Sequence, residues 1–123
     1  MTVKVVDASV VAAILFAEPE IDQALAMLQG CDLIAPQLLP YEVANVATTK
    51  RRRHPESSEL IDVALGKFAE LGIVLVEPDV QAIYRSASAS GLTGYDAAYL
   101  WLSRHEGVEI ATFDRKLQAA SMS

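Results

Sequence analysis

Hydrophobic and polar positions follow two different periods along this chain. Short apolar runs bounded by turn residues are typical of buried strands, and they occur at Val3–Val6, Leu33–Ala35, Ile73–Val76 and Ile110–Thr112. The segments between these runs carry apolar residues three and four positions apart, which is the spacing of a helix with one buried face. Strands that alternate with helices predict an α/β fold, in which helices cover both faces of a short parallel sheet.

Proline and glycine mark the expected ends of the helices. We expect helices at about 8–17, 19–29, 38–53, 55–71, 78–90 and 93–106, and a last helix that begins near residue 114. The helical spacing predicts that Leu25 in the second helix and Leu60 in the fourth helix face the core.

Length and composition limit the kind of protein. A chain of 123 residues with 52% hydrophobic residues is expected to form a single domain over residues 1–123 with a sizeable core. No apolar run reaches the length needed to span a bilayer. The N-terminus has one lysine followed by a predicted strand, without a signal-peptide pattern. We therefore expect a soluble, cytoplasmic protein that does not associate with membranes.

The charge distribution is uneven. The net charge of −6 argues against a purely electrostatic binder of nucleic acid. Four of the ten basic residues are nevertheless consecutive, and this basic block comprises Lys50, Arg51, Arg52 and Arg53. One interpretation is a solvated helix end, favoured by the helix dipole. The other is a contact with RNA phosphates or with a protein partner.

Acidic side chains recur where strands end and helices begin. Asp7 follows the first predicted strand, Asp114 follows the last, Glu42 lies in the third helix, and Asp96 lies three residues after Thr93 in the sixth. Taken singly, the aspartates could cap helices and Glu42 could be an ordinary exposed glutamate. Taken together, these positions can converge at one edge of a parallel sheet. Converging carboxylates repel one another, and a hard divalent cation such as Mg²⁺ is the usual compensation.

Polar residues accompany these acids. Ser9 and Thr112 place hydroxyl groups near Asp7 and Asp114, and Asn45 lies one helical turn beyond Glu42. A metal site flanked by polar and basic groups would suit a phosphodiester substrate.

Four segments carry a resemblance to a known family, and they lie in order along nearly the whole chain: Val5-Val6-Asp7-Ala8-Ser9, Tyr41-Glu42-Val43-Ala44-Asn45-Val46, Leu92-Thr93-Gly94-Tyr95-Asp96-Ala97-Ala98-Tyr99-Leu100, and Ala111-Thr112-Phe113-Asp114-Arg115-Lys116-Leu117. With this order and spacing, the chain resembles the PIN-domain ribonucleases. Within them it is most similar to the toxins of bacterial and archaeal VapBC toxin–antitoxin systems.

The resemblance implies a three-layer α/β/α PIN-like fold and a function. Asp7, Glu42 and Asp96 match the family's metal-binding core, and Asp114 matches its fourth and least constant acid. The implied activity is Mg²⁺- or Mn²⁺-dependent endoribonuclease cleavage of RNA, by a homodimer that a cognate VapB-like antitoxin inhibits. The alternative is an RNA- or partner-binding regulatory module with little nuclease activity.

Overall fold

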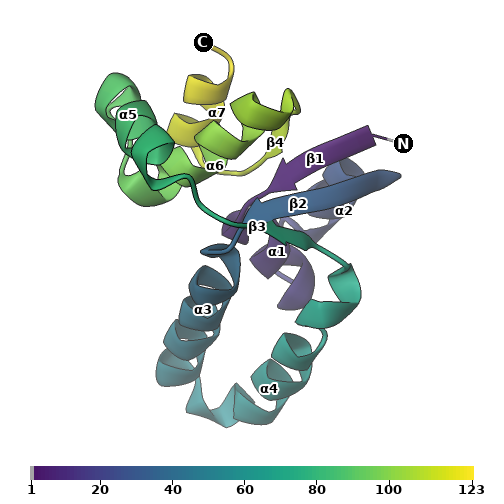
Figure 1. The fold of residues 1–123 in the computed structure, drawn as a ribbon. Helices are drawn as coiled ribbons and strands as arrows, with labels where there is room; N and C mark the ends of the chain where they lie inside the picture. The colour runs from purple at the N-terminus through teal and green to yellow at the C-terminus, as the bar shows by residue number, and fades with distance from the viewer. Residues whose placement is uncertain (1) are drawn as a thin grey trace.

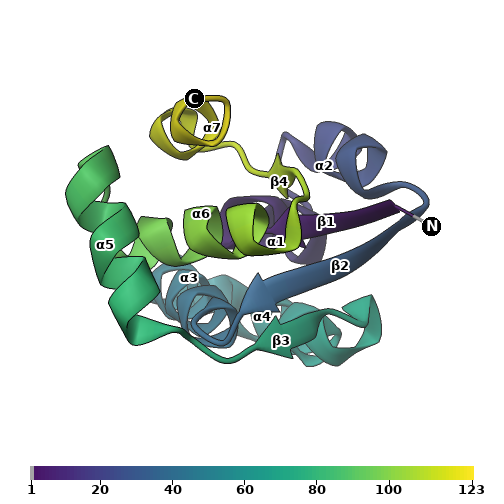
Figure 2. The ribbon, with the colours of Figure 1, turned by 45° about the horizontal axis from the view of Figure 1, so that its top comes forward.

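A short parallel sheet lies between two layers of helices in the computed structural model, which describes residues 2–123 (Figures 1 and 2). Its strands are β1 (Thr2–Val6), β2 (Cys31–Pro36), β3 (Val74–Val76) and β4 (Ile110–Ala111). Within the described range all pairings are parallel and the strand order is β3-β2-β1-β4. The predicted three-layer α/β/α fold is therefore confirmed.

The helices divide between the two faces of the sheet. Their bounds are α1 (Ala8–Leu15), α2 (Ile21–Leu28), α3 (Leu39–Arg53), α4 (Ser58–Gly66), α5 (Val80–Ser90), α6 (Gly94–Glu106) and α7 (Arg115–Ser121). Helices α1, α2 and α3 pack on one face, α6 and α7 pack on the other, and α5 packs against α6. No helix in residues 2–123 combines the length and apolar character needed to cross a membrane.

Successive side chains of β1 and β2 pack into two hydrophobic cores on opposite faces of the sheet, because side chains alternate across a sheet. In β1, Val6 belongs to the core beneath α1 and α3, whereas Val5 belongs to the core beneath α6 and α7. Ala35 and Ile34 divide in the same way in β2. This double burial explains why the strands are apolar at successive positions rather than at every second one.

Two predicted core positions are wrong. Leu25 is exposed, and Ala24 is the buried residue of α2. Leu60 is 74% exposed, and Ile61 beside it is buried. A spacing of three to four residues fits two adjacent helix faces nearly equally well, so the sequence predicted the helices while missing which side faces inward.

The predicted helix at 55–71 is broken into three pieces. A 3₁₀ turn at Pro55–Ser57 precedes α4, and another at Phe68–Leu71 follows it. The α-helix ends at Gly66, a weak helix former, and the Lys67 N–H then donates to Ala64 O at 3.1 Å in a tighter turn. The helix expected from Pro19 likewise begins later, at Ile21, after a turn in which Ile21 N–H donates to Glu18 O at 3.0 Å.

A matched pair of leucines tests this core. Leu100 of α6 is fully buried, so Leu100→Ala should lower the free energy of unfolding by about 2–5 kcal/mol through lost burial and a cavity. Leu60→Ala removes the same atoms from an exposed site and should change stability by no more than about 0.5 kcal/mol. Urea unfolding measures both, and equal losses would contradict the observed orientation of α4.

Candidate functional site

The strand order reverses direction at β1. From β1 the chain builds β2 and β3 on one side, and then adds β4 on the other. Val6 pairs with Ala111, so the residues that follow them, Asp7 and Thr112, leave the sheet side by side. A crevice outside the carboxyl ends of such strands is the usual ligand site in open α/β sheets.

Asp7 is held by hydrogen bonds from both strand ends. It is only 5% exposed, and its Oδ1 accepts from Ser9 N at 3.1 Å, Val10 N at 3.2 Å and Ser9 Oγ at 2.6 Å. Its Oδ2 accepts from the Thr112 hydroxyl. The predicted helix cap is therefore present, and the carboxylate is also fixed against β4.

The two hydroxyl groups extend this network along the chain beyond β4. Phe113 N donates to Ser9 Oγ at 3.0 Å, and Asp114 N donates to Thr112 Oγ1 at 2.9 Å. Asp114 in turn caps α7, because its Oδ1 accepts from Leu117 N at 2.9 Å. The structure thus brings Ser9, Thr112 and Asp114 to the edge of the sheet where Asp7 lies.

Glu42 is oriented by a residue that the sequence analysis did not single out. Tyr99, which is 1% exposed in α6, donates its hydroxyl to Glu42 Oε1 at 2.6 Å. Burial, followed by the hydrogen bond and charge of Glu42, raises the pKa of Tyr99, so it remains a donor. The available signal was its position three residues after Asp96, on the same helix face.

Asp96 lies in the first turn of α6. Thr93 caps this helix, because its Oγ1 accepts from Asp96 N at 3.1 Å. This is the side-chain bond expected from the Thr93–Asp96 spacing, and it fixes the first turn of α6, where Asp96 lies.

The acids act on one another electrostatically. Burial is the largest cause that raises the pKa of Asp7, Glu42 and Asp96 above their usual values. The charges of Asp7 and Asp96 raise the pKa of Glu42 further, although its bond from Tyr99 opposes this. The charge of Asp114 likewise raises the pKa of Asp96, against the lowering effect of Thr93 and Lys116. The four carboxylates therefore form one negatively charged group.

A model of the PIN domain matches residues 4–121. The chain belongs to the PIN domain family. It is 33% identical over 118 residues to the ribonuclease VapC3 of Pyrobaculum aerophilum, which corresponds to 92% of this chain and 90% of that protein. The family resemblance inferred from the four sequence segments is confirmed.

Solved structures agree with this assignment. The crystal structure of PAE2754 from Pyrobaculum aerophilum superposes with a TM-score of 0.79 at 26% identity, over 98% of this PIN domain and 85% of that chain. VapC20 of Mycobacterium tuberculosis, a toxin that cleaves the sarcin–ricin loop, has a TM-score of 0.69 over 97% of this chain and 95% of its own. At 15% identity, the second likeness shows the fold alone.

The four carboxylates of this PIN domain are suitable ligands for a hard divalent cation, although their positions do not form a complete metal site. In residues 2–123 no three Asp, Glu, His or Cys side chains lie close enough to form a metal-binding cluster as they stand. The donors are nevertheless carboxylate oxygens, which Mg²⁺ prefers. A cation would offset both the burial and the neighbouring negative charges that raise the pKa values of Glu42 and Asp96.

The basic block lies away from the acids. Helix α3 extends outward from the sheet and forms a hairpin with α4 (Figure 1). With a rise of about 1.5 Å per residue, the last turn of α3 lies about 16 Å along the helix axis from Glu42. Lys50 is engaged there, because its Nζ lies 3.8 Å from Glu18 Oε2 and 5.5 Å from the centre of the Phe16 ring. Arg51, Arg52 and Arg53 are exposed. Asn45, by contrast, borders the same surface hollow as Glu42.

The raised pKa of Asp96 gives a prediction for the metal-free protein. A folded-state pKa above the unfolded value near 3.8 means that ionised Asp96 destabilises the fold at neutral pH, and that this cost disappears below 3.8. Asp96→Asn should therefore be more stable than the wild type at about pH 7 in EDTA, with the advantage shrinking toward about pH 4. Urea midpoints at both pH values measure this.

The control is Asp62→Asn, an exposed acid of α4, which should show no such pH-dependent gain. A wild type more stable than Asp96→Asn at neutral pH would contradict the inferred cost of ionised Asp96 in the folded protein.

Proposed function

We propose that this PIN domain is a divalent-metal-dependent endoribonuclease and the toxin of a type II toxin–antitoxin pair. The observation that carries the proposal is that Asp7, Glu42, Asp96 and Asp114 lie near one another outside the strand ends where the strand order reverses, with burial and neighbouring charges raising the pKa values of Glu42 and Asp96. The likeness to a relative named as a ribonuclease, over 92% of this chain, supports the choice of substrate.

In this proposal each acid has a part that follows from its surroundings. Asp7, fixed by Ser9 and Thr112, would be the rigid ligand of Mg²⁺ or Mn²⁺. Glu42, oriented by Tyr99, and Asp96, at the start of α6, would complete the site. Asp114 would hold a second ion or orient water. When bound, the metal supplies a more acidic water and stabilises charge on the phosphate.

The two histidines contact residues other than the four acids. His54 Nδ1 lies 3.4 Å from Glu56 Oε1 at the end of α3, and His105 stacks on Trp101 with ring centres 5.4 Å apart. This supports a mechanism in which carboxylates position the attacking water and no imidazole acts as the base.

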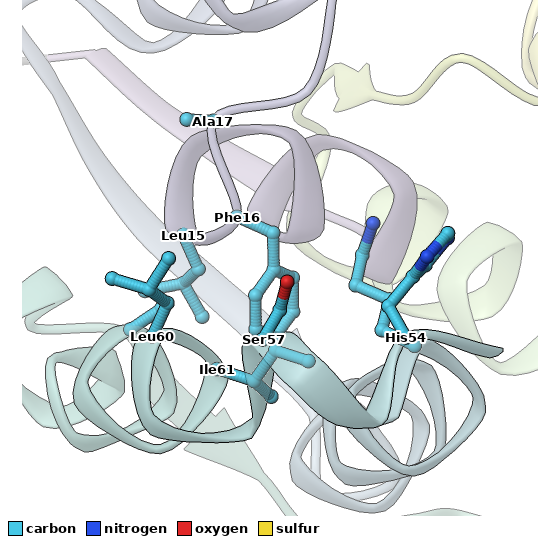
Figure 3. A pocket seen from close by; sticks show the side chains of 9 residues that line it. Leu15, Phe16, Ala17, His54, Ser57, Leu60 and Ile61 are labelled. Carbon is cyan, nitrogen blue, oxygen red and sulfur yellow. The ribbon is translucent and has the colours of Figure 1, made fainter. Parts of the chain in front are cut away.

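The antitoxin is proposed to bind an apolar groove beside the basic block. Phe16 at the end of α1 lines this groove together with Leu60 and Ile61 of α4 (Figure 3). Lys50 and His54 also line the groove. An amphipathic helix with acidic residues on its polar face would suit such a surface.

The homodimer is proposed to use a different surface. Val74 in the edge strand β3, and Val80 and Tyr84 in α5, are exposed apolar residues. A second copy of the chain would cover them.

Two single substitutions, each replacing an Asp carboxylate with the Asn amide, test the catalytic proposal. Asp7→Asn and Asp96→Asn should each lower Mg²⁺-dependent cleavage of single-stranded RNA by more than about 100-fold, since even outer-shell partners of metal ligands contribute 10–100-fold. Cleavage of a labelled RNA is measured with Mg²⁺, Mn²⁺ or EDTA. The exposed-acid variant Asp62→Asn serves as the matched control and should cleave like the wild type.

The alternative of a regulatory module is tested by the same assay. A wild type that binds RNA but does not cut it in either metal would support that module. Wild-type rates in both amide variants would remove these acids from the chemistry.

Replacing Arg51, Arg52 and Arg53 together by Ala separates two uses of the basic block. If the block contacts antitoxin, affinity for the antitoxin should fall while RNA affinity and its salt dependence stay unchanged. If it contacts RNA, the salt dependence of RNA binding should flatten by about 0.7 per lost phosphate contact. Both affinities are measured across a salt series, with Arg85→Ala on α5 as the control. No change in either would leave the block as a solvated helix end.

A further inference from the structure

A shallow hollow lies beside the acidic group, between the starts of α3 and α6. Its volume is about 350 Å³, and its lining includes Tyr41, Glu42, Asn45 and Tyr95. Glu42 therefore belongs both to the acidic group and to this hollow. A ligand that places a phosphate at the acids would bring its neighbouring atoms here.

Two large aromatic rings border this hollow while remaining exposed. Tyr41 is 78% exposed and Tyr95 is 69% exposed. Each directly precedes an acid of the site, Glu42 or Asp96, and successive helix residues point in directions about 100° apart. Each ring therefore points to one side of its neighbouring acid and remains largely open to a ligand.

We propose that this hollow binds a nucleobase of single-stranded RNA, next to the phosphodiester held at the acids. The base stacks on Tyr41 or Tyr95, and the Asn45 side chain hydrogen-bonds its edge. This inference rests on the proposed function for its substrate class and adds the contact that places the RNA. A paired base could not enter, because its faces are covered by its neighbours in the duplex.

The lining chemistry favours a base over other occupants. Glu42 is the sole charged residue among the hollow's lining in the described chain, so the hollow would repel phosphate and acidic peptides and would admit a neutral planar ring. Aromatic side chains stack on every base, and an Asn amide offers both a donor and an acceptor. The exposed Tyr84 of α5 lies outside this lining and has no acid beside it.

The test compares ring removal with hydroxyl removal. Binding of a labelled single-stranded RNA is followed by fluorescence anisotropy with Ca²⁺, which takes the same oxygen ligands. Tyr41→Ala or Tyr95→Ala should raise the dissociation constant about 5- to 150-fold, the range for losing one stacked base. The Phe variants keep the ring face and should bind like the wild type, as should the control Met122→Ala, at an exposed residue just after α7.

An abasic series locates the base. Single abasic sites are moved along the same RNA, and one position should weaken wild-type binding as much as the Ala substitution does. At that position the Ala variant should lose nothing more, because the two changes remove one contact. Additive losses at every position would overturn the proposal.

Further outcomes are decisive. Unchanged RNA affinity in both Ala variants, or equal losses in the Ala and Phe variants, overturns the base site. So does unchanged RNA affinity combined with a shift in sedimentation toward monomer, which would make the rings an interface between copies. A wild type that shows ring-dependent binding yet cuts no RNA in Mg²⁺ or Mn²⁺ supports the base site while the proposed nuclease activity fails.

Discussion

The buried carboxylate of Asp7 is the constraint on which the site depends. A charge that is almost removed from water must be hydrogen-bonded, and Asp7 accepts from Ser9, Val10 and Thr112. These bonds begin α1 and join the end of β1 to the residue after β4. Since β4 has only two residues, these side-chain bonds add to the few backbone bonds that join β1 to β4, such as Asp7 N to Ala111 O at 3.2 Å. The group that would bind metal is therefore also a structural link.

This double use explains why capping and chemistry are compatible here. Asp7 and Asp114 cap helices as their positions suggest, and Thr93 caps the helix that carries Asp96. Each cap fixes the first turn of a helix at or beside one of these carboxylates. Burial then raises the pKa values of Asp7, Glu42 and Asp96. In the metal-free protein, these carboxylates in their ionised form therefore destabilise the folded state. Such local conflict is typical of functional sites.

The sequence was informative where its signals were local. Apolar runs predicted the strands, and glycines and caps predicted most helix ends, whereas the strand order β3-β2-β1-β4 was not predicted. Leu25 and Leu60 were placed wrongly because helical spacing alone leaves the core-facing side open to a shift of one residue. The Tyr99–Glu42 bond could not be predicted, because it joins residues 57 positions apart and a tyrosine among apolar neighbours looks like ordinary core.

The outward course of α3 has a consequence for how such a protein can diverge. This single helix of 15 residues carries Glu42 in its first turn and three exposed arginines in its last, about 16 Å apart along its axis. Substitutions at the far tip of the hairpin touch neither the sheet nor the acids. The exposed surface at that tip can therefore change in sequence between descendants of one ancestral gene without altering the acidic edge of the sheet.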